Sequence, residues 1–425
     1  MRGVPCAPLY ISRRFRARLC SAADSLASRL SAHRRTLSVA VFSVFAFALL
    51  WPSLTASPLA VRFADALHTR GLRVGVACTA GSPAANVLRW FPQLESALTK
   101  AGSVGGGSEI VPLSPYLPQA TYEAMTDVLL ISVYCSTADE GRVAAARAHR
   151  AGAAVLFVTC ENTEARVWAD GSFADQMIGS VDLSLGHVRS IAIEARTDYI
   201  RTPCWLSSAA LKPPTSCTFP AGWDDVSPTF AVAAGNAWAM RPGFAALLSR
   251  HAPYPRRELF DALAAFGASR HFGRVDSPSG VFKNMDASLD MALPGSKITF
   301  LAGYRFIITP ENSRSKTGGY NTEKILDAHL AGVIPIYWGD TPIEPLVFNQ
   351  RRILVFNERP ADDGGSDGMS ELLETIEALE TNSSARVEWF AQPILVRGAR
   401  AWLASWCANL SMKVLALPVR QTELK

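Results

Sequence analysis

The residues best suited to chemistry lie in a polar segment between two apolar runs, 304–309 and 333–338. Both runs are rich in β-branched and aromatic residues, which is typical of buried strands. Between them, Gly318 and Gly319 loosen a loop, and an apolar stripe predicts a helix with Lys324 in its first turn. A helix that starts behind such a loop favours phosphate, because its free N–H groups and its dipole attract anions. A lysine opposes that dipole, so a bound phosphate would explain Lys324.

A second candidate for chemistry is the carboxylate of Glu161, which follows another apolar run at 153–158. If this run is a strand of a parallel sheet, Glu161 lies at the carboxyl edge, where α/β folds bind their ligands. Burial raises the pKa of a carboxylate and suits it to act as a general base. From the residues alone, an ordinary loop acid is the favoured interpretation of Glu161.

These positions carry a resemblance to a known family. The chain reads Glu311-Asn312-Ser313, Tyr320, Thr322-Glu323-Lys324, Ala331-Gly332, Ile334-Pro335 and Gly339. This string resembles the C-terminal signature of the α1,3/4-fucosyltransferases, glycosyltransferase family ten. The segment 159–162 resembles the family's T-G-E-N sequence, with Cys160 in place of the glycine. Residues 175–182, 199–203 and 256–263 resemble further segments of the family.

The resemblance implies a role for each matched residue. Glu161 is the implied catalytic base. The implied donor-binding residues are Arg256, Asn312, Ser313, Tyr320, Glu323 and Lys324. An arginine holds two phosphate oxygens at once, which a lysine does not. Arg257 takes that role if the alignment slips by one residue.

Structural alternatives exist for these residues. Glu323 could be a first-turn acid that merely suits the helix dipole, and Lys324 could be a surface charge. Asn312 and Ser313 could be turn formers. Asn321 or Thr322 is expected to cap the helix that contains Lys324.

The wider pattern predicts an α/β protein of two Rossmann-like domains with a cleft between them, the GT-B arrangement. Expected strands at 72–78, 127–135 and 153–158 alternate with helices at 86–100 and 138–149. A second alternation begins with a strand at 229–233 and a helix at 256–266, and helices at 370–380 and 386–409 end the chain. The expected domains are 71–220 for the acceptor and 221–425 for the donor.

The N-terminus has a separate character. Residues 1–36 hold eight arginines and one acid, a net charge of +7. The whole chain has a net charge of +5, so the remaining residues carry −2. Nucleic acid is therefore not an expected partner. The apolar segment 37–54 predicts a membrane anchor of type II, with a basic cytosolic tail at 1–36 and a stem at 55–70. A cleaved signal peptide or a transit peptide is the alternative. The resulting location is the Golgi membrane, with the catalytic part in the lumen.

Six cysteines follow the anchor, which suits an oxidising compartment. Cys204 and Cys217 flank a proline-rich loop and are the expected disulfide, whereas Cys135 and Cys160 are expected to be free and buried. Asn382 and Asn409 begin glycosylation sequons.

The chain is therefore expected to be an inverting enzyme that moves L-fucose from GDP-fucose to a GlcNAc or glucose hydroxyl of a glycan, in α1,3 linkage. No cofactor is expected, since no metal-ligand spacing occurs and basic residues can hold the diphosphate. One alternative is a GT-B transferase with another nucleotide sugar. The other is a glycan-binding protein without activity.

Overall fold

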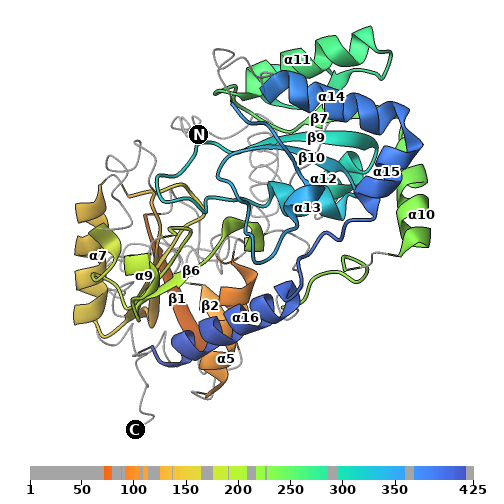
Figure 1. Ribbon diagram of the computed structural model, residues 1–425. Helices are drawn as coiled ribbons and strands as arrows, with labels where there is room; N and C mark the ends of the chain where they lie inside the picture. Colours follow the sequence, from red (N-terminus) through yellow and green to blue (C-terminus); the bar gives the residue numbers. More distant parts are fainter. Residues whose placement is uncertain are drawn as a thin grey trace, which may run out of the picture. The chain divides into compact units, whose positions relative to one another are not determined.

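Two parallel β-sheets organise the chain (Figure 1). The computed structural model describes residues 71–417 except 79–87, 89–90, 105–108, 113–124, 136, 164–175, 190, 208–216, 225–226, 286–294 and 359–367. The first sheet has the order β2-β1-β3-β4-β5-β6, and the second has the order β11-β10-β9-β7-β8. All neighbouring strands pair in parallel, which confirms the predicted α/β class with two parallel sheets.

The strands of the first sheet are β1 Gly71–Ala77, β2 Glu109–Pro112, β3 Val128–Ile131, β4 Ala154–Val158, β5 Leu183–Gly186 and β6 Tyr199–Arg201. Its helices are α5 Pro92–Val104, α7 Ala138–Arg150 and α9 Ile191–Glu194. The strands of the second sheet are β7 Gly243–Leu247, β8 Val275–Asp276, β9 Tyr304–Pro310, β10 Ile334–Trp338 and β11 Leu354–Val355. The remaining α-helices are α10 Pro228–Ala239, α11 Arg256–Ser269, α12 Ser296–Leu301, α13 Lys324–Leu330, α14 Gly368–Thr381, α15 Ser383–Phe390 and α16 Ala399–Leu415.

The central strands are apolar along their whole length because the sheet is covered on both faces. In β3 and β4, Leu130 and Leu156 belong to one core, whereas Leu129, Val155 and Phe157 belong to another. Successive side chains of a strand point to opposite faces, so this division assigns one core to each face. β4 is therefore held rigidly, and it fixes the position of the residues that follow it.

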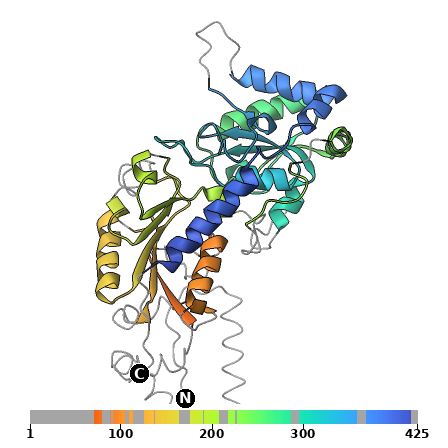
Figure 2. The same cartoon turned by 60° about the horizontal axis from the view of Figure 1, so that its bottom comes forward.

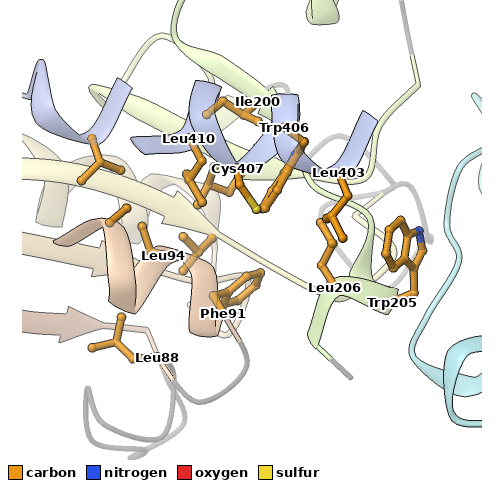
Figure 3. Packing of buried hydrophobic residues seen from close by; sticks show 14 of the residues in the cluster. Leu88, Phe91, Leu94, Ile200, Trp205, Leu206, Leu403, Trp406, Cys407 and Leu410 are labelled. Carbon is orange, nitrogen blue, oxygen red and sulfur yellow. The ribbon is translucent and has the colours of Figure 1, made fainter. Parts of the chain in front are cut away.

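The last helix, α16, lies against α5 of the first sheet (Figure 2). Leu403, Trp406 and Leu410 of α16 share a core with Leu88 and Leu94 on the other side (Figure 3). A continuous helix over 386–409 was expected, but the chain forms α15 and α16 with a break at 391–398. The break contains a proline, which removes a helical hydrogen bond, and the next helix starts behind a glycine with φ of 92°. The chain thus returns to the first sheet after building the second.

Two further local predictions are wrong. The strand expected at 229–233 is part of helix α10: Ser227 accepts a hydrogen bond from the Phe230 N–H at 3.2 Å, and a proline follows as the first helical residue. Neither Asn321 nor Thr322 caps α13, whose N-cap position is Glu323 and has no side-chain cap bond. The Asn321 amide instead donates to the Tyr337 hydroxyl at 2.8 Å, and the Thr322 hydroxyl donates to Glu311 at 2.8 Å.

The disulfides also differ from expectation. Cys78 pairs with Cys135, and Cys217 pairs with Cys407, so the expected Cys204–Cys217 bond is wrong and Cys135 is not free. Cys160 is free, as expected. Cys204 is buried with its thiol 3.8 Å from the Thr159 carbonyl, away from Cys217. Cysteine spacing does not determine connectivity, and here one partner is supplied by α16.

The predicted tail, anchor and stem, 1–70, lie outside the described residues. Among the residues that the structure describes, no helix is long and apolar enough to cross a membrane. The sequon residue Asn382 caps α15 by accepting from the Ser384 N–H at 2.9 Å, and Asn409 lies within α16.

Candidate active site

Glu161 follows directly from the carboxyl end of β4. Its backbone N–H donates to the Thr159 hydroxyl at 3.0 Å, which fixes the turn out of the strand. The Tyr134 hydroxyl donates to its Oε1 at 2.9 Å, and burial together with the Glu161 charge raises the pKa of Tyr134. Glu161 is half-buried. The carboxylate is therefore oriented by a tyrosine that stays protonated. The carboxylate itself remains partly accessible to solvent.

The turn after β4 touches the loop after β9. The Asn162 side-chain amide donates to the Ser313 hydroxyl at 2.8 Å and to the Arg314 carbonyl at 3.0 Å. Asn162 is 2% exposed, so its side of this partly buried contact is shielded from solvent. It places Glu161 beside the segment that carries the sequence signature, which sequence analysis alone did not establish.

Tyr320 lies close to several of the predicted residues. Burial first, and then the charges of Glu311, Cys204, Glu161 and Glu323, raise the pKa of its phenol well above 10. The residue is 1% exposed, and its ring meets that of His187 at a centroid distance of 5.2 Å. The predicted donor contact thus has its ring packed inside the protein, with the carboxylates around it.

Glu311 is the hub of the signature segment. It is fully buried, and its Oε1 accepts the Thr322 N–H at 2.8 Å. Its Oε2 accepts from the Thr322 hydroxyl and from Lys324 Nζ, both at 2.8 Å. The end of β9 is thereby tied to the first turn of α13. The sequence contained a signal for this role, since a glutamate directly after a buried strand needs a cationic partner.

Lys324 and Glu323 are both held by opposite charges. The Lys324 side chain is 20% exposed and is bound to Glu311. Lys297 Nζ contacts Glu323 Oε1 at 3.4 Å and Asp327 Oδ2 at 2.7 Å. Burial opposes ionisation of Glu323, but Lys297 and then Lys324 lower its pKa to about 2. Glu323 is therefore ionised at neutral pH, and both side chains lie in one cluster of alternating charge.

Arg256 opens helix α11 and is 4% exposed. Its Nη2 donates to Asn312 Oδ1 at 2.6 Å and to the Pro310 carbonyl at 3.5 Å, whereas its Nε has no hydrogen-bond partner. Within the described part of the chain it pairs with no carboxylate, and burial lowers the pKa of its guanidinium. The charge of Glu311 partly offsets this effect of burial, but no carboxylate of the described residues forms an ion pair with Arg256. A buried arginine without an ion pair, at a helix N-terminus, is suited to bind an anion. Arg257, the alternative, is exposed and lies over the Phe282 ring at 4.5 Å.

Asp340 organises the loop between Ser313 and Tyr320, and sequence analysis missed it. Its carboxylate accepts the Ser315 N–H at 2.9 Å and the Tyr320 N–H at 2.8 Å, and it also accepts the Ser315 hydroxyl. Asp340 follows Gly339 at the carboxyl end of β10. That position, shared with Glu161 and Glu311 on their strands, is the signal that could have identified it.

Comparison with known proteins finds two similar fucosyltransferases. The chain is 28% identical over 208 residues to an α-(1,3)-fucosyltransferase of Helicobacter pylori, which is 48% of this chain and 37% of that protein. It is 30% identical over 99 residues, 23% of this chain, to a protein of Acanthamoeba polyphaga mimivirus assigned to the fucosyltransferases, of which it spans 15%. Over about half of its length the chain is therefore similar to an α-(1,3)-fucosyltransferase. No protein-family model matches it.

The chain thus spans well under half the length of these two fucosyltransferase relatives. Among solved structures, an α1,3-fucosyltransferase aligns with 81% of this chain and 91% of its own, at 18% identity and a TM-score of 0.48. The glycotransferase of kitacinnamycin aligns with 80% of this chain and 94% of its own, at 13% identity and a TM-score of 0.28.

Proposed function

We propose that this protein is an inverting fucosyltransferase, which moves L-fucose from GDP-fucose to a GlcNAc or glucose hydroxyl of a glycan in α1,3 linkage. The contact of Asn162 with Ser313 and Arg314 carries the proposal. It joins a carboxylate at the end of β4 to the loop that leads to Lys324, so a base and cations adjoin one another. A glycosyl transfer needs both, one for the acceptor and one for the leaving group.

The reaction we propose is a single displacement. The acceptor hydroxyl oxygen attacks the anomeric carbon of fucose while its proton passes to the Glu161 carboxylate. The bond between the anomeric carbon and the diphosphate oxygen breaks, and GDP leaves with the electron pair. The Tyr134 hydroxyl, at 2.9 Å from Glu161, holds the carboxylate in one orientation.

The cations stabilise the departing diphosphate in this proposal. Arg256 has an Nε without a hydrogen-bond partner and no ion pair among the described residues, so it can donate to a phosphate. Lys324 is shared with Glu311 and acts as a positioned donor rather than as an unopposed charge. Asn312 and Ser313, which touch Arg256 and Asn162, line the expected nucleotide pocket. Glu323 binds sugar hydroxyls, and Tyr320 supports the loop behind them.

The further parts of the proposal come from the sequence. We expect the protein to act without a metal cofactor, since Arg256 and Lys324 supply positive charge for the diphosphate. We expect it in the Golgi membrane, anchored by residues 37–54 with the catalytic part in the lumen. An EDTA treatment that leaves turnover unchanged supports the first expectation, and location of a tagged full-length chain tests the second.

The decisive experiment measures GDP release from GDP-fucose with a panel of GlcNAc-containing acceptors. Glu161→Gln should lower kcat by about 10²–10⁴-fold, the usual contribution of a general base. Glu374→Gln, the same change at an exposed position on α14, should leave kcat unchanged. Equal turnover in wild type and Glu161→Gln would refute the base. Turnover with another nucleotide sugar alone would replace the donor, and binding of glycans without any turnover would favour a protein without activity.

A further inference from the structure

A pocket of about 470 Å³ lies beside the edge strand β6, apart from the cluster around Lys324. Trp402 and Trp406 of α16 form one wall, and the Trp406 indole donates to the Arg201 carbonyl at 2.8 Å. Arg189, Arg201 and the segment from Glu344 to Leu346 form the others. The volume falls within the range of small-molecule sites, about 300–1,000 Å³.

The charges of this pocket are balanced. Both guanidinium groups donate to Glu344. Arg189 Nη2 lies 3.1 Å from its Oε1, and Arg201 Nη1 lies 2.9 Å from its Oε2. A second acid, Glu194, also lines the pocket. Two arginines against two acids leave no net charge. A phosphate or a nucleotide would find no excess of positive charge, so the lining favours a neutral ligand.

The lining offers two kinds of contact that belong together in one class of ligand. Trp402 and Trp406 present apolar aromatic surface, which packs against the C–H face of a sugar ring. The arginines and Glu344 present planar donors and acceptors suited to neighbouring hydroxyls. Arg201 Nε is buried without a hydrogen-bond partner, and the Arg189 side chain is 30% exposed. These groups fit a neutral oligosaccharide.

The pocket also lies at the end of the first sheet where Glu161 lies, the carboxyl ends of its strands. Glu161 follows β4, Arg189 follows β5 by three residues, and Arg201 ends β6, and these strands are neighbours in that order. Neighbouring strands lie about 4.8 Å apart, so β6 is about 10 Å from β4, a distance that a short chain of linked sugars spans. Arg201 Nη2 reaches the Gly319 carbonyl at 3.4 Å, next to Tyr320, so the pocket adjoins the candidate site.

We propose that this pocket binds the part of an acceptor oligosaccharide that lies beyond the sugar receiving fucose. The inference rests on the proposed function and gives it a substrate class: chains of several neutral sugars in preference to a single GlcNAc. Acceptor recognition would then depend on α16 and the 344–346 segment as well as on the loops of the first sheet.

Leu346→Arg tests the proposal without opening the core, because Leu346 is 64% exposed at the pocket. Leu415→Arg is the matched control: that residue is 48% exposed on α16 and does not line the pocket. We expect Leu346→Arg to lower kcat/KM at least tenfold for a neutral tetrasaccharide with an internal GlcNAc, and to change it less than twofold for a simple GlcNAc glycoside. The control should change neither. An equal effect on both acceptors, or on neither, would overturn the pocket assignment.

A binding measurement separates this inference from the proposed function. Saturation-transfer NMR with the same tetrasaccharide and no donor should give a signal in wild type and in Leu415→Arg, and lose it in Leu346→Arg. That result supports the pocket even if no fucose is transferred, whereas binding unchanged by Leu346→Arg, or absent in wild type, overturns it. Asn409 also lines the pocket, so peptide mass spectrometry that finds it fully glycosylated would assign the space to the protein's own glycan and overturn the proposal.

Discussion

Replacing Glu311 by glutamine should destabilise the second sheet's loops more than any change of similar size at the surface. The substitution keeps the shape of the side chain and removes its charge. It turns one oxygen into an NH₂ group that faces Lys324 Nζ and the Thr322 hydroxyl, both now 2.8 Å from Oε2. A donor then meets a cationic donor, and bulk water cannot reach the side chain between them, since Glu311 is 0% exposed.

The expected cost follows from the burial of the two partners. Breaking a buried ion pair by removing one partner costs about 3–5 kcal/mol. The Lys324 side chain is 20% exposed, so water solvates part of the ammonium, and we expect a loss of about 2–4 kcal/mol. At about 2 °C per kcal/mol for a chain of this size, Tm should fall by about 4–8 °C.

Calorimetric unfolding of wild type, Glu311→Gln, Lys324→Met and the double variant measures the pair directly. The double variant should lose about 1–3 kcal/mol less stability than the two single losses added together, because it leaves no uncompensated charge. Glu258→Gln, an exposed change in the first turn of α11, is the control. A Glu311→Gln shift no larger than that of the control, or single losses that simply add, would refute the role of Glu311 as a hub.

Three further changes test the surrounding contacts. Burial opposes ionisation of Glu323, but Lys297 lowers its pKa to about 2. The carboxylate therefore stabilises the fold above about pH 4.5 and loses that effect as the pH falls toward 2. Because the side chain is 37% exposed, the free energies of unfolding of Glu323→Gln and wild type should converge by only about 1 kcal/mol over this pH range. Asn162→Ala removes two hydrogen bonds of about 1 kcal/mol each, so Tm should fall by about 4 °C, and the KM for GDP-fucose, measured by GDP release, should rise about tenfold. Gly319→Ala forces a Cβ to 2.9 Å from the His187 carbonyl at a φ of +94°, and should lower stability by about 2 kcal/mol or more in urea unfolding.

Local patterns predicted the unit from β9 to β10 well. Its two strands, its glycine-bearing loop and the helix that ends just before Gly332 are each encoded within a few residues, so apolar runs and breakers sufficed. The same holds for the strand before Glu161. A five-residue, mostly apolar run fits a strand or a helix equally well, and at 229–233 the helix start signal Ser227-Pro228 favours the helix.

Contacts between distant segments could not be predicted in this way. The signature drew attention to Lys324, but the role of Glu311 depends on β9 ending opposite the first turn of α13. The contact of Asn162 with Ser313 joins residues 151 positions apart. The disulfide partner of Cys217 lies 190 positions away, and only the return of α16 to the first sheet brings it near. The roles of the site residues, as distinct from their positions, stay predictions until the variants are measured.

The return of α16 has a consequence for synthesis of the protein. The residues that complete the first sheet's core, with Cys407 among them, leave the ribosome 190 residues after Cys217. At a translation rate of about 5–20 residues per second, the last helix of the first sheet's core is synthesised roughly 10–40 s after Cys217. During that interval the face of α5 that α16 will cover is exposed, and the Cys217 thiol has no partner. The nascent chain should therefore be a client of chaperones and thiol oxidoreductases until its final residues emerge.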